Sequence, residues 1–353
     1  MPALNQTLGQ YSELFMLLAA ATYTVAFIAF AWDLASSSKS LRAAEAQPAA
    51  APQERDLALV GAGAAAATPA SAGTTTGRGA SSSSSVASAV TANGDMKYRS
   101  GRRAAARAAV AVTILGVLIH GAGVVTRGLA AGRVPWGNMY EFLTTGAFVA
   151  IAVFLLVLTR RDLRFLGTFV VGLGTIMLVA AAVAYWTPVG HLVPALQSYW
   201  LVIHVSIAVM SSALFTLTFA MSVFQLIQSR RESTIAAGGA DKLPFMRMVP
   251  NALSLENLSY RINTIGFVGW TFTLMFGAIW AEKAWGRFWG WDTKEVWTFV
   301  IWVVYAGYLH ARATRGWTGT RAAWLSIVGY LCVVFNFTIV NQFFNGLHSY
   351  SGL

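Results

Sequence analysis

The sequence predicts an all-α, polytopic integral membrane protein with about eight transmembrane helices. Of its 353 residues, 56 % are hydrophobic and 11 % are charged, whereas soluble domains are about 45–50 % apolar and about 25 % charged. Its mean hydropathy is +0.57. Lysine and arginine lie mostly in short segments between apolar runs. The net charge of +11 therefore indicates control of membrane topology and excludes nucleic acid as the expected partner.

Eight apolar runs approach the length of about 20 residues that a helix needs to cross a bilayer. The first run is not a convincing signal peptide, because it lacks a basic start and a clear small-residue cleavage site. The runs lie at 12–33, 104–126, 141–159, 164–186, 199–228, 259–281, 295–312 and 322–346.

The segment 34–103 differs from the rest of the chain. It consists largely of Ala, Ser, Thr and Gly, and such a composition buries too little apolar surface to offset the entropy of ordering it. We therefore expect three parts. Residues 1–33 form a first transmembrane helix, 34–103 a disordered cytoplasmic linker without a site, and 104–353 a seven-helix core.

The distribution of basic residues predicts the orientation in the membrane. The loops that share a side with the linker hold 18 Lys and Arg, and the opposite loops hold 5. Because cytoplasmic loops are enriched in basic residues, both termini are predicted to be extracytoplasmic, with the working face outside the plasma membrane. The predicted outer regions are 127–140, 187–198, 282–294 and the C-terminal tail.

The stretch "WGRFWGWDTKEVW", residues 285–297, concentrates four tryptophans and four charged residues in one predicted outer loop. Interfacial aromatic belts explain isolated tryptophans, but they explain this density less well. Asp292 followed by Glu295 has the spacing of a capping box at the start of the seventh helix. Gly286 and Gly290 allow the backbone to approach a planar ligand. We expect a short external amphipathic segment, 285–295, beside such a ligand.

Two histidines flank this stretch at matched depth. His204 lies near the outer start of the fifth run, and His348 follows the eighth. Imidazole is a good axial ligand for haem iron, and flat aromatic side chains pack on porphyrins. The pair therefore indicates a haem site. The alternative is that both are hydrogen-bonded polar residues at the interface.

The remaining histidines do not pair with each other. His310 lies at the inner end of the seventh run, His120 within the second and His191 in an outer loop. His120 and His310 differ in height by roughly 15–20 Å at a rise of 1.5 Å per residue, which is too far for ligation of one iron. The chain has one cysteine, Cys332, and no CxxCH, so it cannot attach a haem covalently to itself.

Four motifs occur in a fixed order within residues 104–353: "PALQSYWLVIHV", "WGRFWGWDTKEVW", "YLHAR" and "GLHSY". Together with "RVPWGNMYEF", they resemble the CcsA (ResC) family of cytochrome c biogenesis proteins, within the WWD-domain haem-handling superfamily. The first helix and linker are similar to actinobacterial-type members. One departure is Thr293, where the family usually has proline. Since threonine can occupy the first helical position and Asp292 still caps, we expect little functional loss.

The resemblance implies a System II holocytochrome c synthase that works with a CcsB- or ResB-like membrane subunit. Its members carry haem b across the membrane and present it for covalent attachment to the CxxCH of apocytochrome c, which a thioredoxin-like reductant keeps reduced. The resemblance implies that His204 and His348 are the outer iron ligands and catalytic pair. It also implies that His310 binds haem within the membrane, opposite a partner histidine. Residues expected at the porphyrin edge are Trp285, Trp289, Trp291 and Asp292.

Three other functions stay open. A haem exporter or chaperone would deliver haem to another ligase and form no covalent product. A bis-histidine b-type cytochrome subunit would pass electrons between redox-active haems. A solute permease without a cofactor would be colourless when purified.

Overall fold

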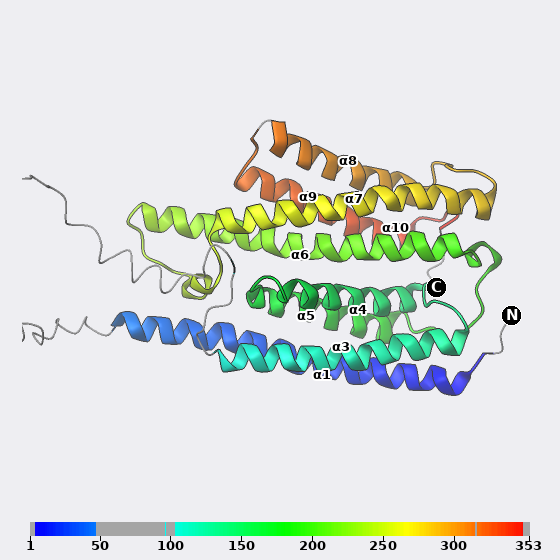
Figure 1. The fold of residues 1–353 in the computed structure, drawn as a ribbon, viewed down its shortest axis with the longest axis horizontal. Coiled ribbons are helices and arrows are strands. Elements are labelled where there is room, and N and C mark those ends of the chain that lie inside the picture. Colours follow the sequence, from blue (N-terminus) through cyan, green and yellow to red (C-terminus); the bar gives the residue numbers. More distant parts are fainter. Residues whose placement is uncertain (1–3, 47–95, 97–102, 315, 349–353) are drawn as a thin grey trace, which may run out of the picture.

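The computed structural model describes residues 4–46, 96, 103–314 and 316–348. Within these ranges the chain is almost entirely helical and has no β-strand, as the composition predicts. Figure 1 shows the long helices side by side with nearly parallel axes. Seven of the described helices are long and apolar enough to cross a membrane. The protein is therefore a multi-pass, all-α membrane protein.

Each predicted run contains an α-helix, but the helices of runs 199–228 and 259–281 extend up to eight residues beyond those runs, and run 322–346 is divided into two helices. Within the described residues, three 3₁₀ turns lie between helices, at Arg164–Leu166 (η1), Pro194–Leu196 (η2) and Pro244–Met248 (η3). The α-helices are α1 (Gln6–Ala46), α3 (Ala104–Ala131), α4 (Met139–Leu158), α5 (Gly167–Ala184), α6 (Tyr199–Ala236), α7 (Ala252–Trp285), α8 (Thr293–Thr314), α9 (Thr320–Phe337) and α10 (Ile339–Phe343).

Helix α8 corresponds to the seventh predicted run, 295–312. It is a regular helix of 22 residues that runs beside α7 and α9 (Figure 1). It is not among the seven helices apolar enough to span by composition alone, since Lys294, Glu295, His310 and Arg312 lie near its ends. That α8 crosses the membrane stays a prediction.

The first helix is longer than predicted. It continues to Ala46 instead of ending near residue 33, so the first part of the predicted linker is helical. The sequence there contains Leu, Arg, Ala and Glu, which have high helix propensity. Apart from Met96 and Arg103, the rest of the segment 47–103 lies outside the described residues.

Two hydrophobic clusters form the membrane core. One is built from α1, α3, α4, α5, α6 and the start of α7, and the other from α6, α7, α8 and α9. Helix α6 contributes to both clusters, because buried residues line it from Leu201 to Gln228. α6 therefore joins the two halves of the bundle, and α7 packs along most of its length.

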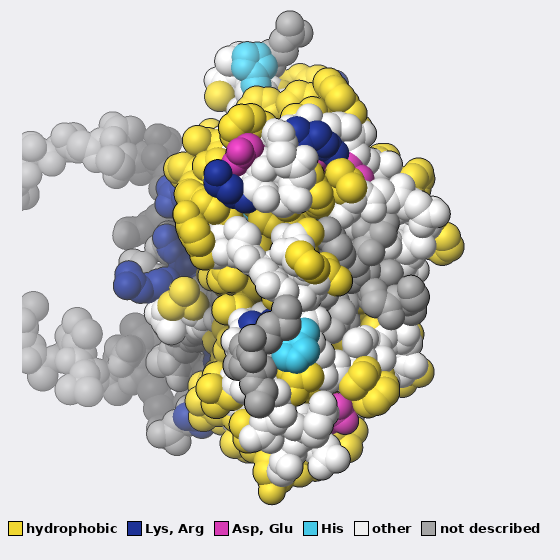
Figure 2. Space-filling model, turned by 90° about the vertical axis from the view of Figure 1, so that its right-hand side faces the viewer, with side chains coloured by type: hydrophobic (Ala, Val, Ile, Leu, Met, Phe, Trp, Pro, Cys, Tyr) yellow, Lys and Arg dark blue, Asp and Glu magenta, His cyan; other side chains and the backbone are white. Residues whose placement is uncertain are grey.

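The predicted outer regions 127–140, 187–198 and 282–294 gather at one end of the bundle (Figure 1). Figure 2 views this end and shows few acidic or basic side chains across it, with one histidine side chain near its centre. A third hydrophobic cluster lies here and includes Trp136, Leu201, Val205 and Trp280. We call this the outer end, after its predicted orientation, which stays a prediction.

A buried ion cluster fixes the α3–α4 loop at the outer end. The Glu141 carboxylate accepts hydrogen bonds from Arg127 Nε at 3.1 Å and from Arg133 Nη1 at 2.7 Å. It also accepts one from the backbone N–H of Gly137 at 2.8 Å. Glu141 is fully buried, so its charge is stable only because these donors surround it. The cluster holds the loop that carries Trp136 against the third hydrophobic cluster.

Candidate functional site

His204 is held by helix α7. Its Nδ1 lies 2.9 Å from the carbonyl oxygen of Thr273, and since a carbonyl only accepts, Nδ1 carries the proton. Close approach of the two helices depends on Gly277, where a Cβ would lie 2.8 Å from Cε1 of the imidazole. The lone pair of His204 is therefore on Nε2, which has no hydrogen-bond partner among the described residues.

His348 is held in the same way by a carboxylate. Its Nδ1 lies 2.9 Å from Oδ1 of Asp292, so Nδ1 again donates and Nε2 has the lone pair. Nε2 makes no hydrogen bond within the described chain. A histidine whose Nδ1–H binds a carboxylate or carbonyl is the arrangement typical of metal-ligating imidazoles. Both histidines have it.

Asp292 connects the α7–α8 loop to the segment after α10. Its oxygens accept from the backbone N–H of Lys294 at 3.0 Å and of Leu347 at 2.9 Å, in addition to His348. The hydrogen bond from His348 is the largest influence that lowers the pKa of Asp292 from 3.8 to about 2, while burial acts in the opposite direction. At neutral pH the group is therefore a carboxylate.

The predicted capping box is present at the start of α8. Glu295 accepts from the backbone N–H of Asp292 at 3.1 Å, while Asp292 accepts from that of Lys294. Glu295 also accepts from Gly290 N at 2.8 Å, so it fixes the tryptophan-rich loop as well as the helix start. Thr293 is the first residue of α8, and the capping hydrogen bonds of Asp292 and Glu295 are present with threonine at this position.

Trp280 lies between the two histidines. Its ring stacks on His204 with centroids 5.8 Å apart and planes 13° apart, and it meets His348 edge-on at 5.4 Å. Its indole N–H donates to the carbonyl of Ala195 at 3.1 Å, which fixes the ring. Trp285 packs edge-on against Trp280 at 4.7 Å and against His348 at 4.8 Å. An aromatic wall therefore joins both imidazoles.

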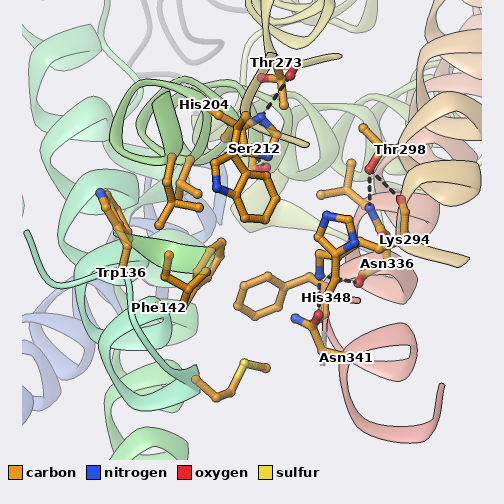
Figure 3. A pocket seen from close by; sticks show the side chains of 18 of the residues that line it. Trp136, Phe142, His204, Ser212, Thr273, Lys294, Thr298, Asn336, Asn341 and His348 are labelled. Carbon is orange, nitrogen blue, oxygen red and sulfur yellow. Dashed lines mark hydrogen bonds between the residues drawn. The ribbon is translucent and has the colours of Figure 1, made fainter. Parts of the chain in front are cut away.

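Both histidines line one cavity of about 150 Å³ (Figure 3). A neighbouring cavity of about 60 Å³ shares His204, Trp280 and His348 and reaches Trp289. Clefts that hold ligands usually enclose about 300–1,000 Å³, so a ligand larger than a few waters requires this region to widen. Residues that line the larger cavity include Trp136, Met139, Phe142, Leu201, Val205, Ser212, Trp270, Thr273, Lys294, Thr298, Val333, Asn336, Phe337 and Asn341.

The tryptophans of the predicted porphyrin edge lie at different distances from the cavities. Trp285 contacts His348, and Trp289 lines the smaller cavity. Trp291 packs edge-on against Trp289 at 5.8 Å, is 75 % exposed, and lines neither cavity. Its backbone is left-handed, with φ of 59°. Asp292 also lines neither of these cavities; its contact with the site is through His348.

The other three histidines lie away from this site. His310 is exposed near the far end of α8, about 24 Å along the helix from Lys294 at 1.5 Å per residue. His120 is fully buried between α1 and α4, 3.2 Å from the hydroxyl of Tyr23, and it packs edge-on against Phe148. Figure 1 shows α3, which carries His120, and α8 on opposite sides of the bundle. His191 is exposed in the outer loop.

Several residues of the site do not follow from the sequence motifs. Thr273 acts through its backbone carbonyl, which leaves no signal in the sequence. Asn336 and Asn341 do leave one, because polar residues are costly inside an apolar run and usually face a partner or a cavity. Lys294 lies within the tryptophan-rich stretch, but its sequence context predicted only the orientation of the chain in the membrane.

The two Nε2 lone pairs can supply two ligands to an iron whose other ligands do not come from this protein. No group of three or more His, Cys, Asp or Glu occurs among the described residues that could hold a bare metal ion. Two imidazoles beside an aromatic wall match the axial ligation of a porphyrin iron.

The sequence from Trp136 to His348 matches the family described as Cytochrome C assembly protein, over residues 136–348. The chain belongs to this family. It is 36 % identical over 254 residues to the cytochrome c biogenesis protein CcsA of Prochlorococcus marinus, which covers 64 % of this chain and 78 % of the relative. It is also 36 % identical over 267 residues to CcsA of Synechococcus elongatus, covering 64 % and 81 %.

The relatives confirm the family resemblance of the motifs and assign the chain to cytochrome c biogenesis. The matched region of this cytochrome c assembly protein begins and ends on residues that line the cavity, Trp136 and His348. Helices α1 and α3 lie outside it.

Proposed function

We propose that this protein binds haem b between His204 and His348 on the extracytoplasmic face of the plasma membrane and presents it for covalent attachment to apocytochrome c. A CcsB- or ResB-like membrane subunit works with it, and together they form a holocytochrome c synthase. The proposal rests on one observation: the two imidazoles have the same tautomer and the same kind of hydrogen bond. Each has its Nδ1 proton bound to a fixed acceptor and its Nε2 lone pair beside the same aromatic cavity.

The site accepts haem only after it widens. The cavity encloses about 150 Å³, and Trp280 packs against both imidazoles. His204 lies within the long helix α6, whereas His348 follows the five-residue helix α10 in a segment without regular structure. Movement of the segment that carries His348 therefore opens the site at lower cost than movement of α6. Asp292 guides the imidazole back, since it also binds the adjacent backbone at Leu347.

The protein supplies position for a reaction that belongs to the haem and the substrate thiols. In the attachment step, each cysteine S–H adds across a vinyl C=C: a C–S bond forms, and the proton goes to the other vinyl carbon. The addition needs no external oxidant or reductant, but the cysteines must arrive as thiols. Because the outer face of a cell membrane is normally oxidising, a thioredoxin-like reductant must prepare the apocytochrome.

His310 belongs to a second, inner haem position in this proposal. Its side chain is exposed on α8, and no second histidine of the described chain lies beside it. A bis-histidine haem at this point therefore needs a ligand from another chain, which the CcsB-like subunit provides. Haem passes from this position to the site between His204 and His348.

The test is co-expression of this chain with a CcsB-like subunit and a CxxCH apocytochrome in a strain without its own maturation system. Covalent haem is read by haem stain after denaturing electrophoresis. We expect a stained cytochrome with the wild-type chain and with His191→Ala, whose histidine is exposed away from the cavity. We expect no stained band with His204→Ala or His348→Ala.

The same experiment separates the other functions. Purified wild-type protein that holds haem, without a covalent product, supports a haem exporter or chaperone. Haem that is reduced and reoxidised by a quinone, again without a product, supports an electron-transfer subunit. If the protein is colourless, or if His204→Ala and His348→Ala retain both haem and cytochrome maturation, the proposal is wrong.

A further inference from the structure

One side chain with a formal charge lines the cavity between His204 and His348. Of the described residues around it, all are apolar, aromatic, amide, hydroxyl or imidazole except Lys294. Figure 3 shows Lys294 grouped with Thr298, Asn336, Asn341 and His348. Its ammonium group donates to the side-chain oxygen of Asn341 and, at 3.4 Å, to the carbonyl of Asn336. Both acceptors are neutral.

The nearby carboxylates are engaged elsewhere. Asp292 accepts from His348 and from the backbone N–H groups of Lys294 and Leu347. Glu295 accepts from Gly290, Asp292 and Arg287. Among the residues that the structure describes, Lys294 forms no ion pair within 4.0 Å. A partly buried ammonium with only neutral acceptors is costly, and a ligand carboxylate beside it would remove much of that cost.

We propose that Lys294 is the anion-binding group of this cavity and pairs with a carboxylate of the planar ligand held by the two histidines. This inference rests on the proposed function, in which the ligand is haem and the carboxylate is a propionate. To make the pair, the ammonium exchanges Asn341 for the ligand. Asn341 and Asn336 keep the lysine extended into the cavity when no ligand is bound.

The position of Lys294 gives the ligand a direction. Two axial imidazoles fix the plane of a porphyrin but leave its rotation about the axis between them undefined. A point charge on one side of the cavity removes that freedom, because the two propionates lie along one edge of haem and the vinyl groups lie away from it. Lys294 therefore determines which edge is buried near α9 and α10 and which edge is left for substrate thiols.

The experiment compares binding of iron protoporphyrin IX and its dimethyl ester by the purified full-length protein with its partner subunit. The ester keeps the ring, the iron and the vinyl groups but has no propionate charge. Because a hydrogen bond to a charged group contributes about 1.5–3 kcal/mol, we expect the wild-type protein to bind the free acid roughly tenfold or more tightly. Lys294→Met should reduce this ratio to near one without weakening ester binding.

Two control variants complete the design. Lys294→Arg keeps the positive charge and should keep most of the preference for the free acid. Lys283→Met removes an exposed lysine outside the two cavities and should leave the ratio unchanged. The absorption spectrum of both complexes should stay that of a bis-imidazole haem in every variant, because the ligands are intact.

Three results would overturn the inference. If Lys294→Met keeps the wild-type ratio, Lys294 does not contact the carboxylates. If it weakens both ligands equally, Lys294 supports the cavity wall and does not recognise the anion. If the wild-type protein binds neither porphyrin, the proposed haem function itself fails, and this outcome is distinct from the other two.

Discussion

Oδ1 of Asp292 accepts a hydrogen bond from Nδ1 of His348 at 2.9 Å. This bond decides which nitrogen of His348 carries the proton, and so which one is available to a ligand. Sequence analysis placed Asp292 at the porphyrin edge and, alternatively, at the cap of α8. The structure shows the cap, and it adds the contact with His348, which connects the tryptophan-rich loop to the segment after α10.

Replacement of this carboxylate should weaken haem binding without removing either imidazole. Partners of metal-ligating histidines typically contribute about 10–100-fold to affinity, so we expect Asp292→Asn to raise the Kd for haem by about that factor. The measurement is a haem titration followed by absorption. Asp162→Asn is the matched control, since Asp162 pairs with Arg164 away from the cavity. Equal Kd values for wild type and Asp292→Asn would show that the bond has no role in binding.

Asp292 also predicts a pH dependence. Its pKa is lowered from 3.8 to about 2 in the folded protein, so its charged form stabilises the fold. That stabilisation is fully present above about pH 4 and is lost as the pH falls towards 2. The difference in Tm between wild type and Asp292→Asn, in detergent, should shrink as the pH falls from about 4 towards 2. A difference that grows over this range would contradict this assignment.

Gly277 should be essential for the orientation of His204. A Cβ at this position would lie 2.8 Å from Cε1 and 2.9 Å from Nδ1 of the imidazole. We expect Gly277→Ala to displace the ring and to lower the haem content of the purified protein severalfold. Gly307→Ala is the control, because no heavy atom lies within 4 Å of a Cβ there. It should retain haem and gain a little helix stability, by roughly 0.5–1 kcal/mol. Equal haem content in the two variants would exclude this role for Gly277.

The ion cluster at Glu141 should be required for stability. Removal of one partner from a buried ion pair costs about 3–5 kcal/mol, and Glu141 is fully buried between Arg127 and Arg133. We expect Glu141→Gln to lower Tm strongly or to prevent accumulation of the protein. Glu282→Gln breaks the exposed pair with Lys283 and should cost no more than about 1 kcal/mol. Similar Tm values for both variants would mean that the cluster is not needed.

His310 should act independently of the outer pair. It lies near the far end of α8 from the cavity. His310→Ala should therefore leave haem binding by His204 and His348 unchanged when haem is added to the purified protein. In cells, where haem must first reach that site, the same variant should reduce cytochrome maturation. Loss of binding of added haem would place His310 in the outer site.

The sequence carried enough information to predict the helices and the meeting of His204 and His348 at one end of the bundle. The position of each histidine relative to its apolar run is enough to predict its depth in the membrane. The contacts of Thr273, Trp280 and Lys294 could not be predicted, because lipid and the protein interior are similarly apolar. Hydropathy therefore does not indicate which side of α6 or α7 faces the cavity. The extension of α1 to Ala46 was missed because composition outweighed helix propensity in the prediction of a linker.

The two histidines are also synthesised at different times, because His204 precedes His348 in the chain. His204 lies near the start of α6, and His348 follows α10. Most of α6 and the helices α7, α8, α9 and α10 are therefore synthesised between them. A nascent chain therefore contains His204 before His348 has been made. A ligand that needs Nε2 of both His204 and His348 cannot be retained by a truncated or half-inserted chain. In the proposed function, completion of the bundle is therefore a condition for loading, and haem, a reactive iron compound, is kept away from unfinished chains.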